Sequence, residues 1–231
     1  MMYQKSLLNS DDAFSVSVID ARLPRRVVLF AAGAGGNPER HQDLLESLAR
    51  EGSTVVAPHF ARLMSPIPTA TELLTRARRL RLAAEQVPTS DLPLVGAGHS
   101  IGAGLLIALA GGQMWLSREQ SLDVARMPLE RLALLSPAAG FFQAPGALKA
   151  VHCPMTVWVG SEDAIAQKDQ AAFLQQTLRD QAPIEVRIAE GAGHYSFMNV
   201  LPPGVVDPMP DRDAFLLDLA ARIAEFLDPI R

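Results

Sequence analysis

Three residues of the types that form a reactive nucleophile occur in this sequence in the order serine, aspartate, histidine. Ser100 lies in the stretch VGAGHSIGAG, Asp163 in VWVGSEDAI and His194 in GAGHYSFM. A serine hydroxyl attacks a carbonyl carbon only when a base takes its proton, and that base is usually a histidine oriented by a carboxylate. We therefore expect Ser100 to be a nucleophile, His194 its base and Asp163 the orienting acid.

The local pattern around Ser100 is G-x-S-x-G, from Gly98 to Gly102. It follows an apolar run typical of a buried strand and precedes an apolar run typical of a buried helix, which is the context that a nucleophile turn needs. Glycines two residues before and two residues after the serine allow a sharp turn, because side chains there would collide with neighbouring backbone. The turn would present the serine hydroxyl at the end of the sheet.

Each of these residues also has a simpler interpretation. The glycine-rich turn at Ser100 could be a packing device, Asp163 could cap the next helix, and His194 could be a polar loop residue. Glu162 is a competing acid, one residue before Asp163. A joint role is favoured because all three residue types follow predicted strands, in the chain order that such a triad has on a doubly wound sheet.

Strands and helices that alternate along the chain must position these residues. Continuous apolar runs predict strands covered on both faces, and longer segments with helical spacing predict the helices between them. The expected strands are Phe14–Ile19, Arg26–Ala31, Thr54–Ala57, Leu92–Ala97, Arg131–Leu135, Met155–Val159 and Ile184–Ile188. The expected helices are Pro38–Arg50, Thr71–Val87, Gly102–Ala110, Ala166–Arg179 and Asp211–Leu227. This alternation predicts an α/β fold: a doubly wound, mostly parallel sheet of about seven strands, with the site beyond the carboxyl ends of the strands.

Composition excludes several other classes of function. The net charge of −4 and the low aromatic content argue against a nucleic-acid surface, and the single cysteine excludes an internal disulfide. No apolar run reaches the roughly 20 residues that span a bilayer, and MMYQKSLLNSDD is unlike a secretory signal. We expect a cytoplasmic protein that needs no cofactor or metal and has no nucleic-acid or membrane partner. Homodimerisation is left open.

From about Arg26 to Leu227 the chain resembles the α/β-hydrolase superfamily, and within it the dienelactone-hydrolase-like small serine hydrolases. The likeness rests on VVLFAAGAGGNPERHQDLLESLAREGSTVVAP, VGAGHSIGAG, VWVGSEDAI and GAGHYSFM. It implies a single α/β-hydrolase domain over residues 1–231, ester hydrolysis, and acid and base positions at Asp163 and His194. Dienelactone hydrolases proper use cysteine as the nucleophile, so their substrate is not carried over to Ser100.

The resemblance also implies an oxyanion hole. One donor would be the backbone N–H of Ile101, at the positive end of a helix, and the other that of Ala34, in the loop from Gly33 to Gly36. A phosphate cradle is the alternative for this loop, but the loop lacks the lysine and spacing of a P-loop. Many relatives have His-Gly where this chain has Ala32-Gly33, which leaves the backbone donors in place.

Several further residues have two alternative interpretations each. Phe141 and Phe142 either line an acyl pocket or close the core, in a segment too short for a cap domain. His59 either lines the pocket or is structural, and His99 is expected to make core contacts or a backbone hydrogen bond. The arginines of one predicted helix are expected on a solvated face. They are Arg76, Arg78, Arg79 and Arg81.

The sequence thus predicts a serine hydrolase that cleaves a small-molecule carboxylic ester or thioester through an acyl-enzyme. An acyltransferase would use the same three residues and differ only in what accepts the acyl group. A non-catalytic binding protein on the same fold is the alternative from a different class.

Overall fold

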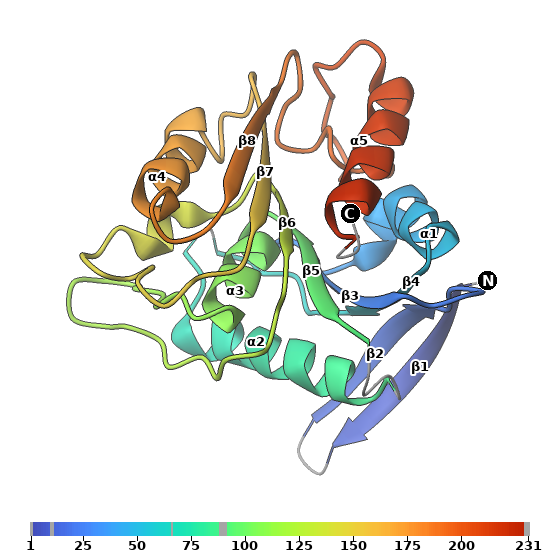
Figure 1. Cartoon of the computed structure of the whole chain (residues 1–231), viewed down its shortest axis with the longest axis horizontal. Coiled ribbons are helices and arrows are strands. Elements are labelled where there is room, and N and C mark those ends of the chain that lie inside the picture. The colour runs from blue at the N-terminus through green and yellow to red at the C-terminus, as the bar shows by residue number, and fades with distance from the viewer. Residues whose placement is uncertain (1, 10–11, 66, 88–91, 229–231) are drawn as a thin grey trace.

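The computed structural model describes residues 2–9, 12–65, 67–87 and 92–228. Its centre is an eight-stranded sheet with the order β1-β2-β4-β3-β5-β6-β7-β8 (Figure 1). The strands are β1 (Met2–Asn9), β2 (Asp12–Ile19), β3 (Arg26–Ala31), β4 (Ser53–Pro58), β5 (Leu94–His99), β6 (Leu132–Leu135), β7 (Met155–Gly160) and β8 (Ile184–Ala189). Strands β3 to β8 are parallel, whereas β1 and β2 join the sheet antiparallel.

Five α-helices and two 3-10 turns connect these strands. They are η1 (Pro38–His41), α1 (Gln42–Arg50), α2 (Ala70–Glu85), α3 (Ile101–Leu109), η2 (Ala139–Phe142), α4 (Lys168–Leu178) and α5 (Arg212–Phe226). Helices α1 and α5 lie side by side on one face of the sheet, and α2, α3 and α4 cover the other face (Figure 1). The sheet is therefore doubly wound.

The predicted fold class is confirmed, and the expected strands agree with the structure to within two residues at either end. The sheet has one strand more than expected, β1, whose sequence MYQKSLLN has no continuous apolar run. The helix predicted over Pro38–Arg50 begins as the 3-10 turn η1, where the side chain of Asn37 accepts a hydrogen bond from the N–H of Glu39. A single domain over residues 1–231 stays a prediction.

Strands β3 and β4 and the whole of α3 are buried, which explains why their sequences are continuous apolar runs. None of the helices in the described part of the chain is both long and apolar enough to cross a membrane.

Helix α3 packs directly against β3 and β5, with glycines of β5 facing the helix and further glycines within the helix itself. A Cβ atom on Gly102 would overlap the carbonyl oxygen of Ala31, and one on Gly98 would lie 2.8 Å from a methyl carbon of Leu106. The glycines of the G-x-S-x-G pattern therefore allow α3 to begin directly against the sheet.

Substituting Gly102 with alanine tests this close approach. We expect Gly102→Ala to lower the free energy of unfolding by about 1–3 kcal/mol, because backbone atoms must move to admit the methyl group, even though alanine favours a helix. Gly140→Ala is the matched control, since a Cβ atom there meets nothing within 4 Å. Urea unfolding measures both, and equal stability of the two variants would contradict the packing argument.

Candidate active site

Ser100 lies at the turn between β5 and α3, with backbone angles of φ 55° and ψ −124°. This conformation is rare for a residue with a side chain and costs of order 1–3 kcal/mol unless the surroundings impose it. The backbone on both sides is held, because the Ser100 N–H donates to the Leu135 carbonyl and the Ser100 carbonyl accepts from Gly104 and Ala138. The strained turn is therefore built into the sheet rather than being a mobile loop.

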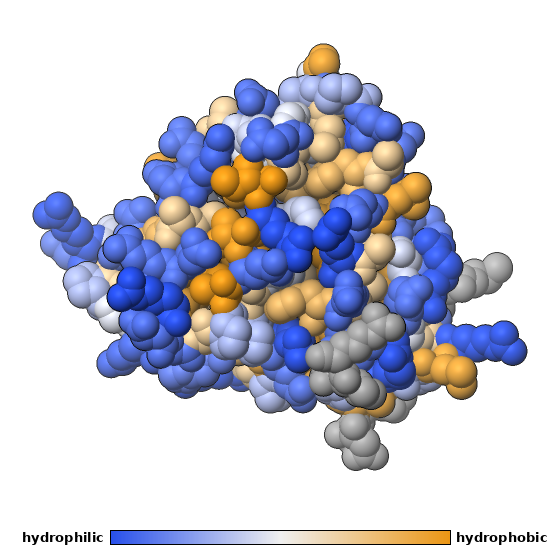
Figure 2. Space-filling model, turned by 45° about the horizontal axis from the view of Figure 1, so that its top comes forward, coloured by the Kyte–Doolittle hydropathy of each residue, from blue (hydrophilic) through white to orange (hydrophobic). Residues whose placement is uncertain are grey.

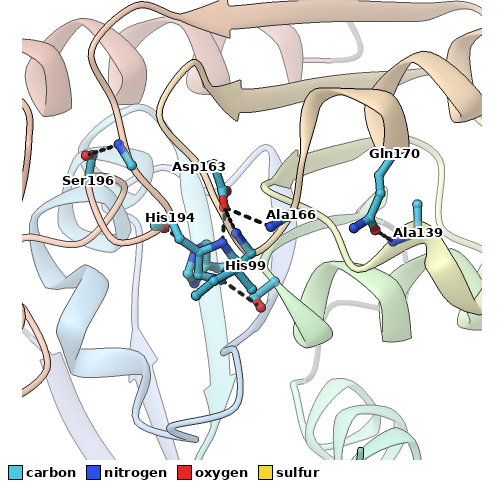
Figure 3. Close-up of polar contacts among 10 residues, drawn as sticks. His99, Ala139, Asp163, Ala166, Gln170, His194 and Ser196 are labelled. Carbon is cyan, nitrogen blue, oxygen red and sulfur yellow. Dashed lines mark hydrogen bonds and ion pairs between the residues drawn. The ribbon is translucent and has the colours of Figure 1, made fainter. Parts of the chain in front are cut away.

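The structure brings Ser100, His194 and Asp163 into one hydrogen-bonded row, in which Figure 3 labels His194 and Asp163. The Nε2 atom of His194 lies 3.0 Å from Oγ of Ser100, and its Nδ1 atom lies 2.9 Å from Oδ2 of Asp163. A carboxylate can only accept, so Nδ1 carries the hydrogen and Nε2 of the neutral ring is free to accept the serine proton. His194 and Asp163 are 7% and 6% exposed, so bulk water does not compete for these bonds.

Asp163 makes the contacts of both interpretations that the sequence left open, a cap for the following segment and a partner of His194. Its Oδ1 atom accepts from the N–H groups of Ile165 and Ala166, each at 2.8 Å, while Oδ2 faces His194. Burial raises the pKa of this carboxyl, but the hydrogen bonds from His194 and the Ala166 N–H, together with attraction to the His194 ring when it is protonated, outweigh this effect, so the pKa is lowered overall. Asp163 is thus a carboxylate at neutral pH. The competing acid Glu162 is exposed, and its carboxylate contacts Ser161.

His99 makes the backbone hydrogen bond that was one of its predicted roles. Its Nε2–H donates to the carbonyl oxygen of His194 over 2.9 Å, which ties the loop of His194 to the end of β5. Its ring also stands between those of His41 and His194, with centroids 5.2 Å and 4.8 Å away. Burial, the largest cause, lowers the pKa of both His41, to about 3, and His99. Both rings are therefore neutral at pH 7.

The glycine-rich loop after β3 lies against Ser100. A Cβ atom on Gly33 would come within 3.2 Å of the Ser100 Cβ atom, so only glycine allows this spacing without a shift. Within the described residues, the N–H groups of Ala34 and Gly35 donate to no backbone oxygen, and neither does that of Ile101 at the start of α3. Free N–H groups at a helix start and in an adjacent loop are what an oxyanion hole requires.

One expectation about the arginine-rich helix is wrong. Arg76 does not lie on a solvated face: it is 3% exposed, and its guanidinium donates to the carbonyl oxygens of Gly33, Ala34 and Ala61. The capping box of Thr69 and Glu72 fixes the start of α2, and Arg76 lies on its buried side with Leu73. Helical spacing of apolar residues does not reveal an arginine that is buried because it bonds to backbone oxygens of other segments.

A cavity of about 320 Å³ opens beside Ser100. Its lining is uncharged and consists of Ser100, Trp115, Leu116, Ala138, Gly140, Phe141, Ile165, Ala166 and Gln170. Gln170 of α4 shapes one wall, since its Oε1 atom accepts from the N–H group of Ala139 (Figure 3) and from that of Gly140. Hydrophobic residues are also interspersed among hydrophilic ones on the face of the molecule shown in Figure 2.

The predicted pocket residues separate into two groups. Phe141 lines the cavity, whereas Phe142 is 1% exposed within the core and His59 is bonded to the Ser17 hydroxyl at 2.7 Å. Neither Phe142 nor His59 is among the residues that line this cavity. Trp115, Leu116, Ile165 and Gln170 were not predicted, because they come from irregular segments or from helix ends without a recognisable motif. In the described part of the chain, no group of three or more His, Cys, Asp or Glu residues could hold a metal ion.

No protein-family model and no curated protein matches this sequence. Solved structures, in contrast, match over nearly its whole length. Dienelactone hydrolase from Anabaena variabilis has a TM-score of 0.69 at 19% identity, covering 98% of this chain and 96% of its own. The chain has the α/β-hydrolase fold.

Two further solved structures share this fold, the second of which is described as a thermophilic esterase. Est1E from Butyrivibrio proteoclasticus has a TM-score of 0.67 at 12% identity, covering 97% of this chain and 98% of its own. Est2 from Thermogutta terrifontis, solved with propionate bound, has a TM-score of 0.67 at 16% identity, covering 99% and 94%. At these identities the likeness establishes the fold, so the activity must be argued from the site.

The strain at Ser100 predicts an inverted order of stability for two substitutions. At the positive φ of Ser100, any residue with a Cβ atom is strained. Alanine has this atom, whereas glycine lacks it. Ser100→Gly should therefore be more stable than Ser100→Ala by about 1 kcal/mol, although glycine usually destabilises. Urea unfolding of the two variants decides this, and a more stable alanine variant would show that the turn is not strained.

The buried neutral histidines predict a pH-dependent stability. The unfolded chain binds a proton on His41 near pH 6.5, whereas the folded chain does so only near pH 3. Stability should thus fall as the pH drops through this window, by up to about 1.4 kcal/mol per pH unit for this residue. In the described residues neither ring nitrogen of His41 has a hydrogen-bond partner, so His41→Leu leaves no partner unpaired.

Urea unfolding at pH 7 and pH 5 measures this effect. We expect His41→Leu to lose less stability between the two pH values than the wild type, and the exposed His152→Leu to behave like the wild type. An unchanged pH dependence in His41→Leu would refute the assignment.

Proposed function

We propose that this chain is a serine hydrolase that cleaves a carboxylic ester or thioester through a Ser100-His194-Asp163 triad. The observation that carries the proposal is the continuous row of hydrogen bonds from Ser100 Oγ through the His194 ring to Asp163, at 3.0 and 2.9 Å. A nucleophile, a base in the correct tautomer and a buried carboxylate are the groups that acyl transfer requires.

In the proposed reaction, Ser100 Oγ attacks the acyl carbon while its proton moves to Nε2 of His194. The negative oxygen of the tetrahedral intermediate accepts hydrogen bonds from the backbone N–H groups of Ile101 and Ala34. The intermediate collapses with cleavage of the bond to the leaving group, which takes the proton from His194. Asp163 stabilises the positive ring between these transfers.

The second half of the reaction releases the acid. Water gives a proton to His194 and adds to the carbonyl carbon of the acyl-enzyme. Collapse of this second intermediate breaks the bond to Ser100 Oγ, which regains its proton from His194, and the carboxylic acid leaves. An acyltransferase would follow the same steps with an alcohol, amine or thiol in place of the water.

The cavity beside Ser100 favours a substrate whose carbonyl carries an uncharged, apolar substituent. All nine lining residues are uncharged, and Trp115, Leu116, Phe141 and Ile165 are apolar. A carboxylate placed there would lose its hydration without an opposite charge to replace it.

Labelling with a fluorophosphonate tests the nucleophile and its acid. The wild type should be labelled and should cleave p-nitrophenyl butyrate, whereas Ser100→Ala should do neither. Asp163→Asn should lower kcat by about 10⁴-fold, because the histidine then adopts the wrong tautomer. The matched controls Ser117→Ala and Glu162→Gln, both exposed, should keep wild-type labelling and turnover.

A wild-type protein that is neither labelled nor active on short esters would contradict the proposal and favour the binding-protein alternative. Loss of activity in Glu162→Gln with retention in Asp163→Asn would reassign the acid. Adding alcohol acceptors to the assay and analysing the products distinguishes acyl transfer from hydrolysis.

The uncharged cavity makes a separate prediction about selectivity. We expect kcat/KM for p-nitrophenyl butyrate to exceed that for the p-nitrophenyl monoester of succinate, in which a carboxylate ends the acyl chain, by at least about tenfold. Equal values for the two esters would show that the acyl group does not occupy the cavity.

A further inference from the structure

Arg76 connects helix α2 to the loop proposed to stabilise the oxyanion. Its Nη1 atom lies 2.8 Å from the carbonyl oxygen of Gly33, and its Nη2 atom lies 3.0 Å from that of Ala34 and 2.6 Å from that of Ala61. The guanidinium also lies 4.9 Å from the centre of the Phe60 ring. The three hydrogen-bond partners are backbone oxygens of two different loops.

Peptide geometry transmits this contact to the candidate oxyanion donor. In a trans peptide the C=O of one residue and the N–H of the next point in opposite directions within one plane, and the structure contains no cis peptide among the described residues. The Gly33 carbonyl points at Arg76, so the N–H of Ala34 must point away from the guanidinium. The same holds for the Ala34 carbonyl and the Gly35 N–H.

We propose that Arg76 is a positioning residue that aims the Ala34 N–H at the oxyanion by holding the carbonyl oxygens of Gly33 and Ala34. This inference rests on the proposed function. Arg76 itself does not touch the substrate, and its effect passes through the Gly33–Ala34 peptide plane.

The loop has other ties that keep it folded without Arg76. The Gly36 N–H donates to Gly33, the Leu63 N–H to Ala34 and the Phe60 N–H to Gly36. Removing the guanidinium should therefore loosen the two peptide planes while the loop stays in place. The loss of Arg76 should therefore weaken stabilisation of the transition state and leave substrate binding nearly unchanged.

The positive charge adds to the positioning effect. Burial lowers the pKa of Arg76 to about 10, so the group is still cationic at neutral pH. A cation at the oxygen end of a peptide polarises it and makes its N–H a stronger donor. The guanidinium reaches the three oxygens from two separate nitrogens, whereas all three donors of a lysine ammonium leave from one atom, so lysine is an incomplete replacement.

Kinetics of Arg76→Met and Arg76→Lys with p-nitrophenyl butyrate test the proposal. We expect kcat to fall about 10²–10³-fold in Arg76→Met, as after the loss of one oxyanion donor, and less in Arg76→Lys, with KM changed by less than threefold in both. Affinity for a trifluoromethyl ketone inhibitor, which forms the tetrahedral adduct, should fall in parallel with kcat. Arg81→Met is the matched control on the same helix, because Arg81 pairs with Glu85 on the exposed face.

A second measurement does not depend on activity. The ¹H–¹⁵N amide signals of Ala34 and Gly35 should shift in Arg76→Lys and Arg76→Met and remain in place in Arg81→Met. The lysine variant covers the case in which the methionine variant does not fold.

The outcomes separate this inference from the proposed function. An unlabelled and inactive wild type would refute the hydrolase proposal. An active wild type with kcat within threefold of normal in Arg76→Lys and Arg76→Met would overturn the role of Arg76, as would a fall in kcat/KM that arises from KM alone. Amide signals of Ala34 and Gly35 that do not shift in the Arg76 variants would overturn the role of Arg76 whatever the kinetic result.

Discussion

The site depends on a serine that is held in an unfavourable backbone conformation at the end of a parallel strand. At φ 55° the chain reverses within one residue, and α3 can begin against β3 only because Gly102 has no side chain. Packing of the buried helix α3 against the sheet offsets this local strain. The position of the hydroxyl is therefore set by the core of the protein, and the histidine and aspartate are brought to it by β8 and β7.

Neutral groups and backbone dipoles do much of the organising around these residues. His99 ties the carbonyl of His194 to β5, and it remains uncharged because it is buried beside two other rings. Arg76 is the exception, a buried cation whose hydrogen-bond partners are backbone oxygens. Burial of a charge is tolerated when hydrogen bonds replace its hydration, which the fork of the guanidinium provides here.

Much of the fold could be predicted from the sequence because its signals are local. Buried parallel strands such as VVLF and TVWV are continuous apolar runs, and the turn at Ser100 has a G-x-S-x-G pattern that follows from its own geometry. Strand β1 was missed because pairing with β2, rather than an apolar run, defines it. Arg76 was missed for a related reason: its partners are backbone oxygens from other segments, which no periodicity reveals. The cavity wall formed by Trp115 and Leu116 likewise comes from tertiary contacts of an irregular segment.

The short segment from Asp163 to Gln170 has two tasks at once. One end carries the carboxylate that faces His194, and the other end clamps the main chain of Ala139 and Gly140 in the cavity wall. A displacement of α4 that widens the cavity would also move the Asp163 carboxylate away from His194. In the proposed hydrolase, the size of the accepted substrate and the rate of proton transfer are thus coupled, and enlarging the cavity without a loss of rate requires changes at Trp115 or Leu116 rather than on α4.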